Sequence, residues 1–279
     1  MGSASPAASA PPPPGLLVPG GSGPRPPAGR GLLSGKVVVV TAAAGAGIGS
    51  AVARRCLDEG ARVVLGDSHE RRLGEIRDRL SDAYPARVWT IPCDVTDEGD
   101  VRRLTDGAVD RYGRLDVLVN NAGLGGDRQV TEMTDDEWSR VLDVTLTGTF
   151  RCTRAALRHM IAQGGGGAVV NNASVLGWRA QAGQAHYAAA KAGVMAFTRC
   201  TALEMAPHGI RVNAVAPSLA AHPFLNRVIG DDELADLAGR EAFGRAAHPW
   251  EVATVVAFLA SDYASYLTGE VISVSSQHP

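Results

Sequence analysis

VVVVTAAAGAGIG, residues 37–49, decides the fold of this chain. Its first five residues form a continuous β-branched run, which is typical of a strand buried on both faces. A glycine-rich turn follows and leads into a helix that we predict from Gly47 to Glu59. Such a turn lets the backbone approach a pyrophosphate, and the following helix N-terminus offers free N–H groups to it. The stretch predicts a dinucleotide site, although an ordinary tight strand-to-helix turn is the alternative.

Apolar β runs and helical patterns alternate through the rest of the chain. This alternation indicates right-handed βαβ crossovers and a doubly wound parallel sheet, so we predict an α/β fold with one domain over residues 32–279. Residues 1–31 are rich in Pro, Ala and Gly and predict a disordered tail. Further strands are expected at 62–65, 88–93, 117–119, 168–171, 211–215 and 271–274, and helices at 69–80, 97–112, 134–162 (one long helix), 187–206 and 250–259.

The composition excludes several classes of protein. The net charge is −2 and the sequence holds no basic block, which argues against nucleic acid or an anionic membrane as a partner. No apolar run is long enough to span a bilayer. The cysteines form no CxxC pair and no metal motif, so we expect buried, reduced thiols in a cytoplasmic protein. They are Cys56, Cys93, Cys152 and Cys200.

Polar residues follow the predicted strands at the edge where a dinucleotide would lie. Asp67 ends the second strand, where a carboxylate accepts hydrogen bonds from an adenosine ribose and repels a 2′-phosphate. This favours NAD(H), but Arg71 and Arg72 leave NADP(H) open, and Asp67 has the alternative role of capping the next helix. Asp94 is placed to hydrogen-bond an adenine amino group. The small residues of Asn121-Ala122-Gly123 leave room for a flat cofactor.

Tyr187 and Lys191 lie four residues apart, on one face of a predicted helix. A free phenol has a pKa of about 10, and a nearby ammonium lowers it. The pair would then act as a general acid/base at an alcohol or ketone oxygen. Ser174 lies thirteen residues earlier, after a predicted strand, where its hydroxyl could meet the same oxygen. A surface Tyr and Lys on an amphipathic helix are the alternative.

Together these residues resemble the short-chain dehydrogenase/reductase family, from about Leu33 to Ser276. The resemblance implies a Rossmann-type domain, a homodimer or homotetramer, and hydride transfer to or from a nicotinamide. It implies that Tyr187 is the acid/base, that Lys191 lowers its pKa and that Ser174 orients the substrate oxygen. The cofactor contacts expected from the motifs and the resemblance together are Ala43, Gly45, Gly47, Ile48, Gly49, Asp67, Asp94, Val95, Asn121, Ala122, Gly123, Tyr187, Lys191, Pro217 and Ser218.

The chain departs from the family's pattern at two positions of its machinery. Ala43 stands in place of the first glycine of the cofactor turn. Thr145 stands in place of a catalytic Asn that supports a water chain to the lysine, partly through its backbone carbonyl. We count Thr145 with the catalytic residues, and we expect the helix to bend near it and its carbonyl to keep that water.

The substrate side is the least specified part of the sequence. Trp178 and Phe224 suit an apolar pocket for a carbocyclic or acyl substrate, although both could simply be core residues. His222 stands where the family has a Thr that meets the nicotinamide carboxamide, and we count it with Trp178 and Phe224 as a substrate residue. The substrate loop is expected at Ser218–Arg245. More weakly, the Trp178-Arg179 segment, Thr145 and the C-terminus resemble actinobacterial dehydrogenases of steroid-ring breakdown.

The sequence therefore predicts an NAD(H)-dependent oxidoreductase that interconverts a secondary alcohol and a ketone. Its substrate would be a small hydrophobic molecule, steroid-derived or linked to coenzyme A. The alternative enzyme is a 3-oxoacyl-thioester reductase of fatty-acid or polyketide synthesis. The alternative of another class is a weakly catalytic dinucleotide-binding scaffold or redox sensor.

Overall fold

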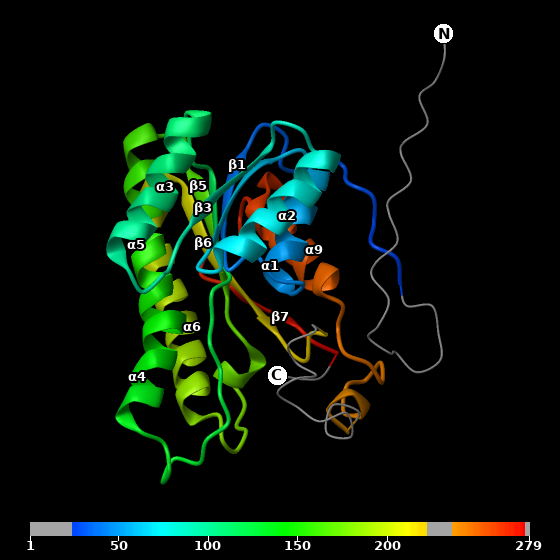
Figure 1. Ribbon diagram of the computed structural model, residues 1–279, viewed down its shortest axis with the longest axis vertical. Coiled ribbons are helices and arrows are strands. Elements are labelled where there is room, and N and C mark those ends of the chain that lie inside the picture. The colour runs from blue at the N-terminus through cyan, green and yellow to red at the C-terminus, as the bar shows by residue number, and fades with distance from the viewer. Residues whose placement is uncertain (1–23, 222–235, 277–279) are drawn as a thin grey trace.

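The computed structural model describes residues 24–221 and 236–276. Within them, seven parallel strands form one sheet in the order β3-β2-β1-β4-β5-β6-β7 (Figure 1). The order reverses between β1 and β4, so the sheet is doubly wound and places a crevice at that point. The strands are β1 (Val37–Thr41), β2 (Arg62–Asp67), β3 (Val88–Pro92), β4 (Val117–Asn120), β5 (Gly167–Asn172), β6 (Ile210–Pro217) and β7 (Val271–Val274).

Helices cover both faces of this sheet, with α1, α2 and α9 on one face and α3, α5 and α6 on the other (Figure 1). All five residues of β1 are buried, as its β-branched run predicts. The predicted α/β doubly wound fold is therefore confirmed. The helices are α1 (Ile48–Asp58), α2 (Glu70–Ala83), α3 (Glu98–Tyr112), α4 (Asp135–Leu142), α5 (Gly148–Gln163), α6 (Ala185–Met205) and α9 (Pro249–Ala260), with short 3-10 turns at η2 (Val175–Gly177), η3 (Ala206–His208) and η4 (Asp262–Ala264).

The single long helix expected over residues 134–162 is wrong in one respect. A π-helical turn, η1 (Asp143–Thr147), separates α4 from α5. Its backbone N–H at Gly148 donates to the carbonyl of Asp143, five residues earlier. Such turns release the regular helical bonding pattern and are frequent at functional sites. The irregularity lies where the sequence analysis expected a local bend, at Thr145.

Ordered packing extends into the last residues of the expected tail. The carboxylate of Glu59, at the end of α1, is fully buried and accepts hydrogen bonds from the backbone N–H groups of Arg30 (2.8 Å) and Leu32 (3.1 Å). The guanidinium of Arg55 pairs with Glu59 and donates to the carbonyl of Pro27. A buried ion pair on α1 thus fixes the segment that enters the domain, which composition alone did not reveal.

Three of the four cysteines are buried as expected, whereas Cys200 on α6 is exposed. Burial raises the pKa of the Cys56 thiol to about 12, so this thiol stays protonated near neutral pH. The helices of residues 24–221 and 236–276 are each too short or too polar to cross a bilayer. In the same ranges, His, Cys, Asp and Glu side chains form no group suited to a metal ion.

Candidate active site

The glycine-rich turn after β1 leaves the N-terminus of α1 open. Gly47 precedes α1, and no side chain caps the helix or places an acidic group in its first turn. Unpaired N–H groups at a helix N-terminus attract an anion such as a pyrophosphate. Gly49 has no room for a side chain, because a Cβ there would lie 2.3 Å from the Ala42 carbonyl oxygen. The turn therefore fits a phosphate approached by backbone rather than by side chains.

The departure at Ala43 does not block this turn. Ala43 is fully buried and lies outside the left-handed region. The residue that takes a left-handed conformation is its neighbour Ala42, with φ of 50°. Non-glycine residues rarely adopt this conformation, and those that do cluster at functional sites.

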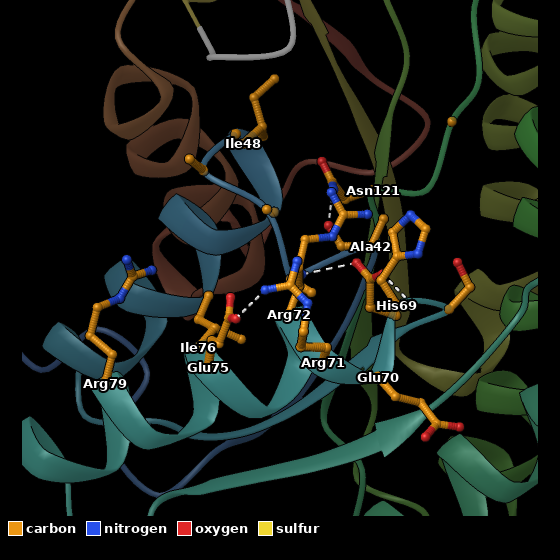
Figure 2. A pocket seen from close by; sticks show the side chains of 18 residues that line it. Ala42, Ile48, His69, Glu70, Arg71, Arg72, Glu75, Ile76, Arg79 and Asn121 are labelled. Atoms are coloured by element: carbon orange, nitrogen blue, oxygen red, sulfur yellow. Dashed lines mark hydrogen bonds and ion pairs between the residues drawn. The ribbon is translucent and has the colours of Figure 1, made fainter. Parts of the chain in front are cut away.

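A cleft of about 1160 Å³ opens beside the turn. The turn and the start of α1 form one side of it, α2 supplies Arg71, Arg72, Glu75 and Arg79, and Asn121 comes from the loop after β4 (Figure 2). Of the expected cofactor residues, seven line this cleft: Gly45, Gly47, Ile48, Gly49, Asp67, Asn121 and Gly123. The other eight lie outside its lining: Ala43, Asp94, Val95, Ala122, Tyr187, Lys191, Pro217 and Ser218.

Asp67 is held in place by two backbone groups at the end of β2. One carboxylate oxygen accepts from the N–H of Ala44 (2.9 Å) and the other from the N–H of His69 (2.9 Å). The second bond reaches the residue before α2 and is not a helix cap, because no side chain caps α2, so the alternative role of Asp67 as a cap is not observed. Burial raises the pKa of its carboxyl group, while the Ala44 hydrogen bond and the charge of Arg72 oppose that shift.

Asp94 and Val95 lie after β3 in different environments. Asp94 is exposed, and one of its carboxylate oxygens accepts from both the N–H (2.9 Å) and the hydroxyl (2.7 Å) of Thr96. Val95 is buried and packs so tightly on Gly148 that a Cβ at Gly148 would lie 2.7 Å from its side chain. Asp94 is thus presented at the edge of the sheet, and Val95 ties that edge to the start of α5.

Three expected catalytic residues come together here. Ser174 follows the carboxyl end of β5, and Tyr187 and Lys191 lie in the first turns of α6. The Ser174 side chain hydrogen-bonds the phenol of Tyr187, and the Lys191 ammonium lies 5.5 Å from the centre of the Tyr187 ring. Burial raises the pKa of the Tyr187 phenol, and the Ser174 hydrogen bond opposes this shift. The net direction is opposite to the lowering of the phenol pKa by Lys191 that the sequence suggested, and the group that opposes burial is Ser174.

Lys191 is itself almost completely buried, with 3% of its surface exposed. This burial lowers the pKa of its ammonium to about 8. The ammonium donates to the backbone carbonyl of Asn172 at the end of β5. An ammonium has three N–H donors, so this geometry leaves donors for a further acceptor at the edge of the sheet.

The Thr145 side chain has a contact that the sequence did not reveal. Its hydroxyl accepts from the N–H of Leu124 (3.0 Å) and lies 3.2 Å from the carbonyl of the same residue. Its own carbonyl accepts the hydroxyl of Thr149 (2.8 Å). The π-helical turn is thereby fixed to the glycine loop after β4, which covers Lys191 at Gly123 and Tyr187 at Gly125. The expected water on the Thr145 carbonyl stays a prediction.

Two further asparagines that sequence reasoning missed or used only in part form a chain of amides at the sheet edge. Asn121 donates to the carbonyls of Thr41 (3.3 Å) and Ala42 (3.1 Å). The side-chain amide of Asn172 donates to the side-chain amide oxygen of Asn121 (3.0 Å). The signal for Asn172 was its polarity at the end of an apolar strand, but its partners depend on the register of the sheet.

The expected substrate residues are only partly described. Trp178 ends the 3-10 turn that begins just after Ser174 and is 43% exposed, so it is no core residue. His222, Phe224 and half of the expected substrate loop, residues 222–235, lie outside the described residues. His186, next to Tyr187 on α6, is buried beneath Gly126.

Comparison with known proteins agrees with this geometry. Residues 42–276 match the family model described as enoyl-(acyl carrier protein) reductase. A Mycobacterium tuberculosis protein named (5R,7aS)-5-hydroxy-7a-methyl-1-oxo-2,3,5,6,7,7a-hexahydro-1H-indene-carboxyl-CoA reductase is 66% identical over 252 residues, covering 90% of this chain and 96% of the relative. The cis-4-hydroxycyclohexanecarboxylate dehydrogenase of Sinomonas cyclohexanicum is 45% identical, covering 86% of this chain and 94% of the relative.

A solved structure shares the fold over nearly its whole length. The crystal structure of a short chain dehydrogenase from Mycobacterium smegmatis has a TM-score of 0.83 and 58% identity, covering 92% of this chain and 99% of the other. With the match of the family model over most of the sequence, the resemblance drawn from the motifs is confirmed: the chain belongs to the short-chain dehydrogenase/reductase family and is an oxidoreductase.

Proposed function

We propose that this protein interconverts a secondary alcohol and a ketone on a carbocyclic substrate carried as a coenzyme A thioester, with NAD(H) as the cofactor. The observation that carries the proposal is the meeting of Ser174, Tyr187 and Lys191 at the edge of the sheet that also bears the open α1 N-terminus. The nicotinamide supplies a hydride acceptor or donor. The remaining chemistry is the transfer of one proton at the substrate oxygen, which falls to this chain.

Each of the three side chains has a separate task in that transfer. The phenol of Tyr187 gives its proton to the carbonyl oxygen in reduction and takes it back in oxidation. Ser174 bonds the phenol in this structure, and its single hydroxyl proton would turn to the carbonyl oxygen of a bound substrate and so fix the position of that oxygen. Lys191 supplies positive charge that stabilises the phenolate when the proton has left. Its remaining N–H donors suit the hydroxyls of the nicotinamide ribose.

NAD(H) is favoured because Asp67 lines the cleft with both oxygens held by Ala44 and His69. A carboxylate fixed in this way cannot swing aside for a 2′-phosphate, and two like charges would meet. Arg71 is paired with Glu75 on α2, which reduces its attraction for a phosphate. Asp67→Asn should therefore lower the preference for NADH over NADPH by about ten- to a hundredfold.

Fluorescence titration with both reduced cofactors tests this assignment. Glu70→Gln is a matched control, because it removes a carboxylate from the same cleft while leaving Asp67 and the Arg71–Glu75 ion pair intact, and it should change the preference far less. Equal affinity of the native protein for both cofactors would show that the arginines of α2, and not Asp67, govern the site.

The substrate class is proposed from two supports. The exposed indole of Trp178 follows Ser174 by four residues and offers apolar surface near the reacting oxygen. Two relatives are named for hydroxyl groups on carbocycles, and one of those names includes coenzyme A. A Thermotoga maritima relative that is 39% identical and named 3-oxoacyl-[acyl-carrier-protein] reductase keeps linear 3-oxoacyl thioesters as the second candidate.

A substrate panel separates these candidates. Absorbance of NADH at constant enzyme would be followed with cyclic hydroxy- or keto-acyl-CoA thioesters, the same cyclic compounds as free acids, and linear 3-oxoacyl thioesters, in both directions. We expect kcat/KM to be highest for the cyclic thioesters. A higher value for the linear thioesters would establish the second candidate instead. The homo-oligomer and the cytoplasmic location expected from the sequence remain predictions.

A further inference from the structure

Asn172 stands between the two parts of the site. It is the last residue of β5, with the β4 edge and Asn121 beside it and Lys191 reaching it from α6. Its neighbour Asn171 points to the opposite face of the sheet, where it accepts from Asn120 and donates to Thr198 (2.9 Å) within a buried polar network. Two adjacent asparagines of one strand thus serve different layers of the molecule.

The direction of the amide chain at Asn172 is fixed by its chemistry. The Asn121 amide nitrogen faces the carbonyls of Thr41 and Ala42, which can only accept, so the NH₂ group of Asn121 must point toward the turn. Its oxygen must then point toward Asn172, which answers with its own NH₂ group at 3.0 Å. Asn172 thereby supports, through Asn121, the left-handed residue Ala42 of the dinucleotide turn.

The main chain of Asn172 holds the other part of the site. Its carbonyl accepts the Lys191 ammonium, while the carbonyl of Thr145, on which the sequence analysis expected a water linked to Lys191, accepts the Thr149 hydroxyl. Any shift of Asn172 therefore displaces an acceptor of the buried ammonium.

The side-chain oxygen of Asn172 indicates that this residue does more than fill space in the core. Its side-chain oxygen is buried and has no hydrogen-bond partner among the residues that the structure describes. An apolar side chain of the same size would leave no such unsatisfied oxygen, and a buried polar atom without a partner calls for a reason. The bond to Asn121 is the function that an apolar residue could not supply.

We propose that Asn172 is a positioning residue that couples the dinucleotide turn to the catalytic lysine, its side-chain amide supporting Asn121 under the turn and its carbonyl holding the Lys191 ammonium. Binding of the dinucleotide at the turn then fixes the position of Lys191. A substitution at Asn172 should change both the affinity for the dinucleotide and the environment of the Lys191 ammonium. This rests on the proposed function, because it needs a nicotinamide dinucleotide as the ligand.

NADH titration of Asn172 variants tests the coupling. Asn172→Asp has the same size but replaces the NH₂ donor by an oxygen that faces the Asn121 oxygen, so we expect the Kd for NADH to rise at least tenfold. Asn172→Leu removes the donor without adding charge and should also raise the Kd. The matched control is Asn171→Ser, which disturbs the neighbouring amide on the other face and should lower Tm while leaving the Kd within about twofold.

The pH dependence of NADH binding adds a readout that a merely structural role would not change. Among the described residues, the titratable group that faces Lys191 is Tyr187. The other groups that face Lys191 are uncharged: the Asn172 carbonyl at the end of β5, Gly123 in the loop after β4, and Thr145 in the π-helical turn. Affinity should fall as Lys191 loses its proton. The carboxylate of Asn172→Asp stabilises the ammonium, so this fall should move to higher pH by about one unit.

The outcomes are distinguishable. A native protein that binds neither NADH nor NADPH would overturn the proposed function and this inference with it. If the native protein binds NADH while Asn172→Asp and Asn172→Leu bind it within twofold of the native affinity, the proposed function stands and the coupling role is wrong. Should Asn172→Leu not fold, the isosteric Asn172→Asp decides alone.

Discussion

The turn at residues 41–49 and the cluster of Ser174, Tyr187 and Lys191 lie at the same edge of the sheet. The turn presents backbone groups to a ligand, whereas the cluster presents side chains. At the turn, the available groups are backbone N–H groups at the start of α1, and side chains matter chiefly where there is no room for them, as at Gly49. At the cluster, the available groups are a hydroxyl, a phenol and an ammonium.

This difference explains which departures from the family's pattern are harmless. The methyl group of Ala43 is buried and does not line the cleft, and Ala43 needs no left-handed backbone. A side chain in the cluster has no such substitute, since its own atoms carry the chemistry. We therefore expect substitutions at the cluster to reduce turnover and substitutions at the turn to change stability or affinity.

Tyr187→Phe should give the largest effect. Removing the phenolic oxygen removes the proton transfer, so kcat should fall by about 10²–10⁴ while the Kd for NADH stays within a few-fold of the native value. Steady-state kinetics and fluorescence titration on the same preparation measure both quantities. A variant that keeps most of its turnover would remove Tyr187 from the mechanism and erase the distinction between the two regions.

Thr145 should give a smaller effect, because its hydroxyl holds the loop at Leu124 and lies one contact away from the reacting groups. Thr145→Val keeps the shape and loses the hydroxyl, and we expect a loss of less than about tenfold in kcat, below about 1.4 kcal/mol in barrier. Thr145→Ser keeps the hydroxyl and is the control, with near-native kinetics. A loss in Thr145→Val as deep as that of Tyr187→Phe would place the hydroxyl itself in the proton transfer.

Lys191 should reveal its burial through the pH dependence of stability. Its pKa of about 8 in the folded protein lies below the value of about 10.4 in an unfolded chain. Between these values the unfolded state binds more protons, so this group makes the native protein more stable as pH rises. Lys191→Met lacks the group, and its Tm relative to the native protein should therefore fall as pH rises from 7 to 10. A relative Tm that rises over this range would contradict the lowered pKa.

The smallest effects are expected at the turn itself, where two neighbouring alanines form a matched pair. Ala42→Gly should leave the free energy of unfolding unchanged or raise it. The substitution removes a left-handed conformation that costs an alanine roughly 1–2 kcal/mol, and this gain outweighs the added entropy of glycine in the unfolded chain. Ala43→Gly has no strain to relieve and should lower the free energy of unfolding by about 1 kcal/mol. Urea unfolding of both variants measures the difference. Equal losses in both would show that φ at Ala42 is not the controlling feature.

The parts of the fold that could be predicted are those set by local sequence. The strands Val37–Thr41 and Val271–Val274 have the predicted bounds because runs rich in β-branched residues favour strands, although β1 is fully buried and β7 only partly. The residues of the catalytic cluster were found because helical spacing places Tyr187 and Lys191 on one face.

The parts that could not be predicted depend on contacts between distant segments. The π-helical turn interrupts a continuous helical pattern, and its Thr145 is fixed by Leu124, which lies 21 residues away. Asn172 acquires its partners only when β4 and β5 pair in register. The packing of residues 27–32 depends on the burial of Glu59, whose charge alone would have placed it at the surface.

The most direct test of the account follows a hydride and a proton in one experiment. NADH carrying deuterium at both C4 positions would be incubated with the best cyclic keto-acyl-CoA thioester. Mass spectrometry would then measure the amount of the alcohol product and its deuterium content. The account predicts one deuterium on the carbinol carbon with the native protein, and product formation at least about a hundredfold slower with Tyr187→Phe. Product without deuterium, or product formed equally fast by Tyr187→Phe, would contradict it.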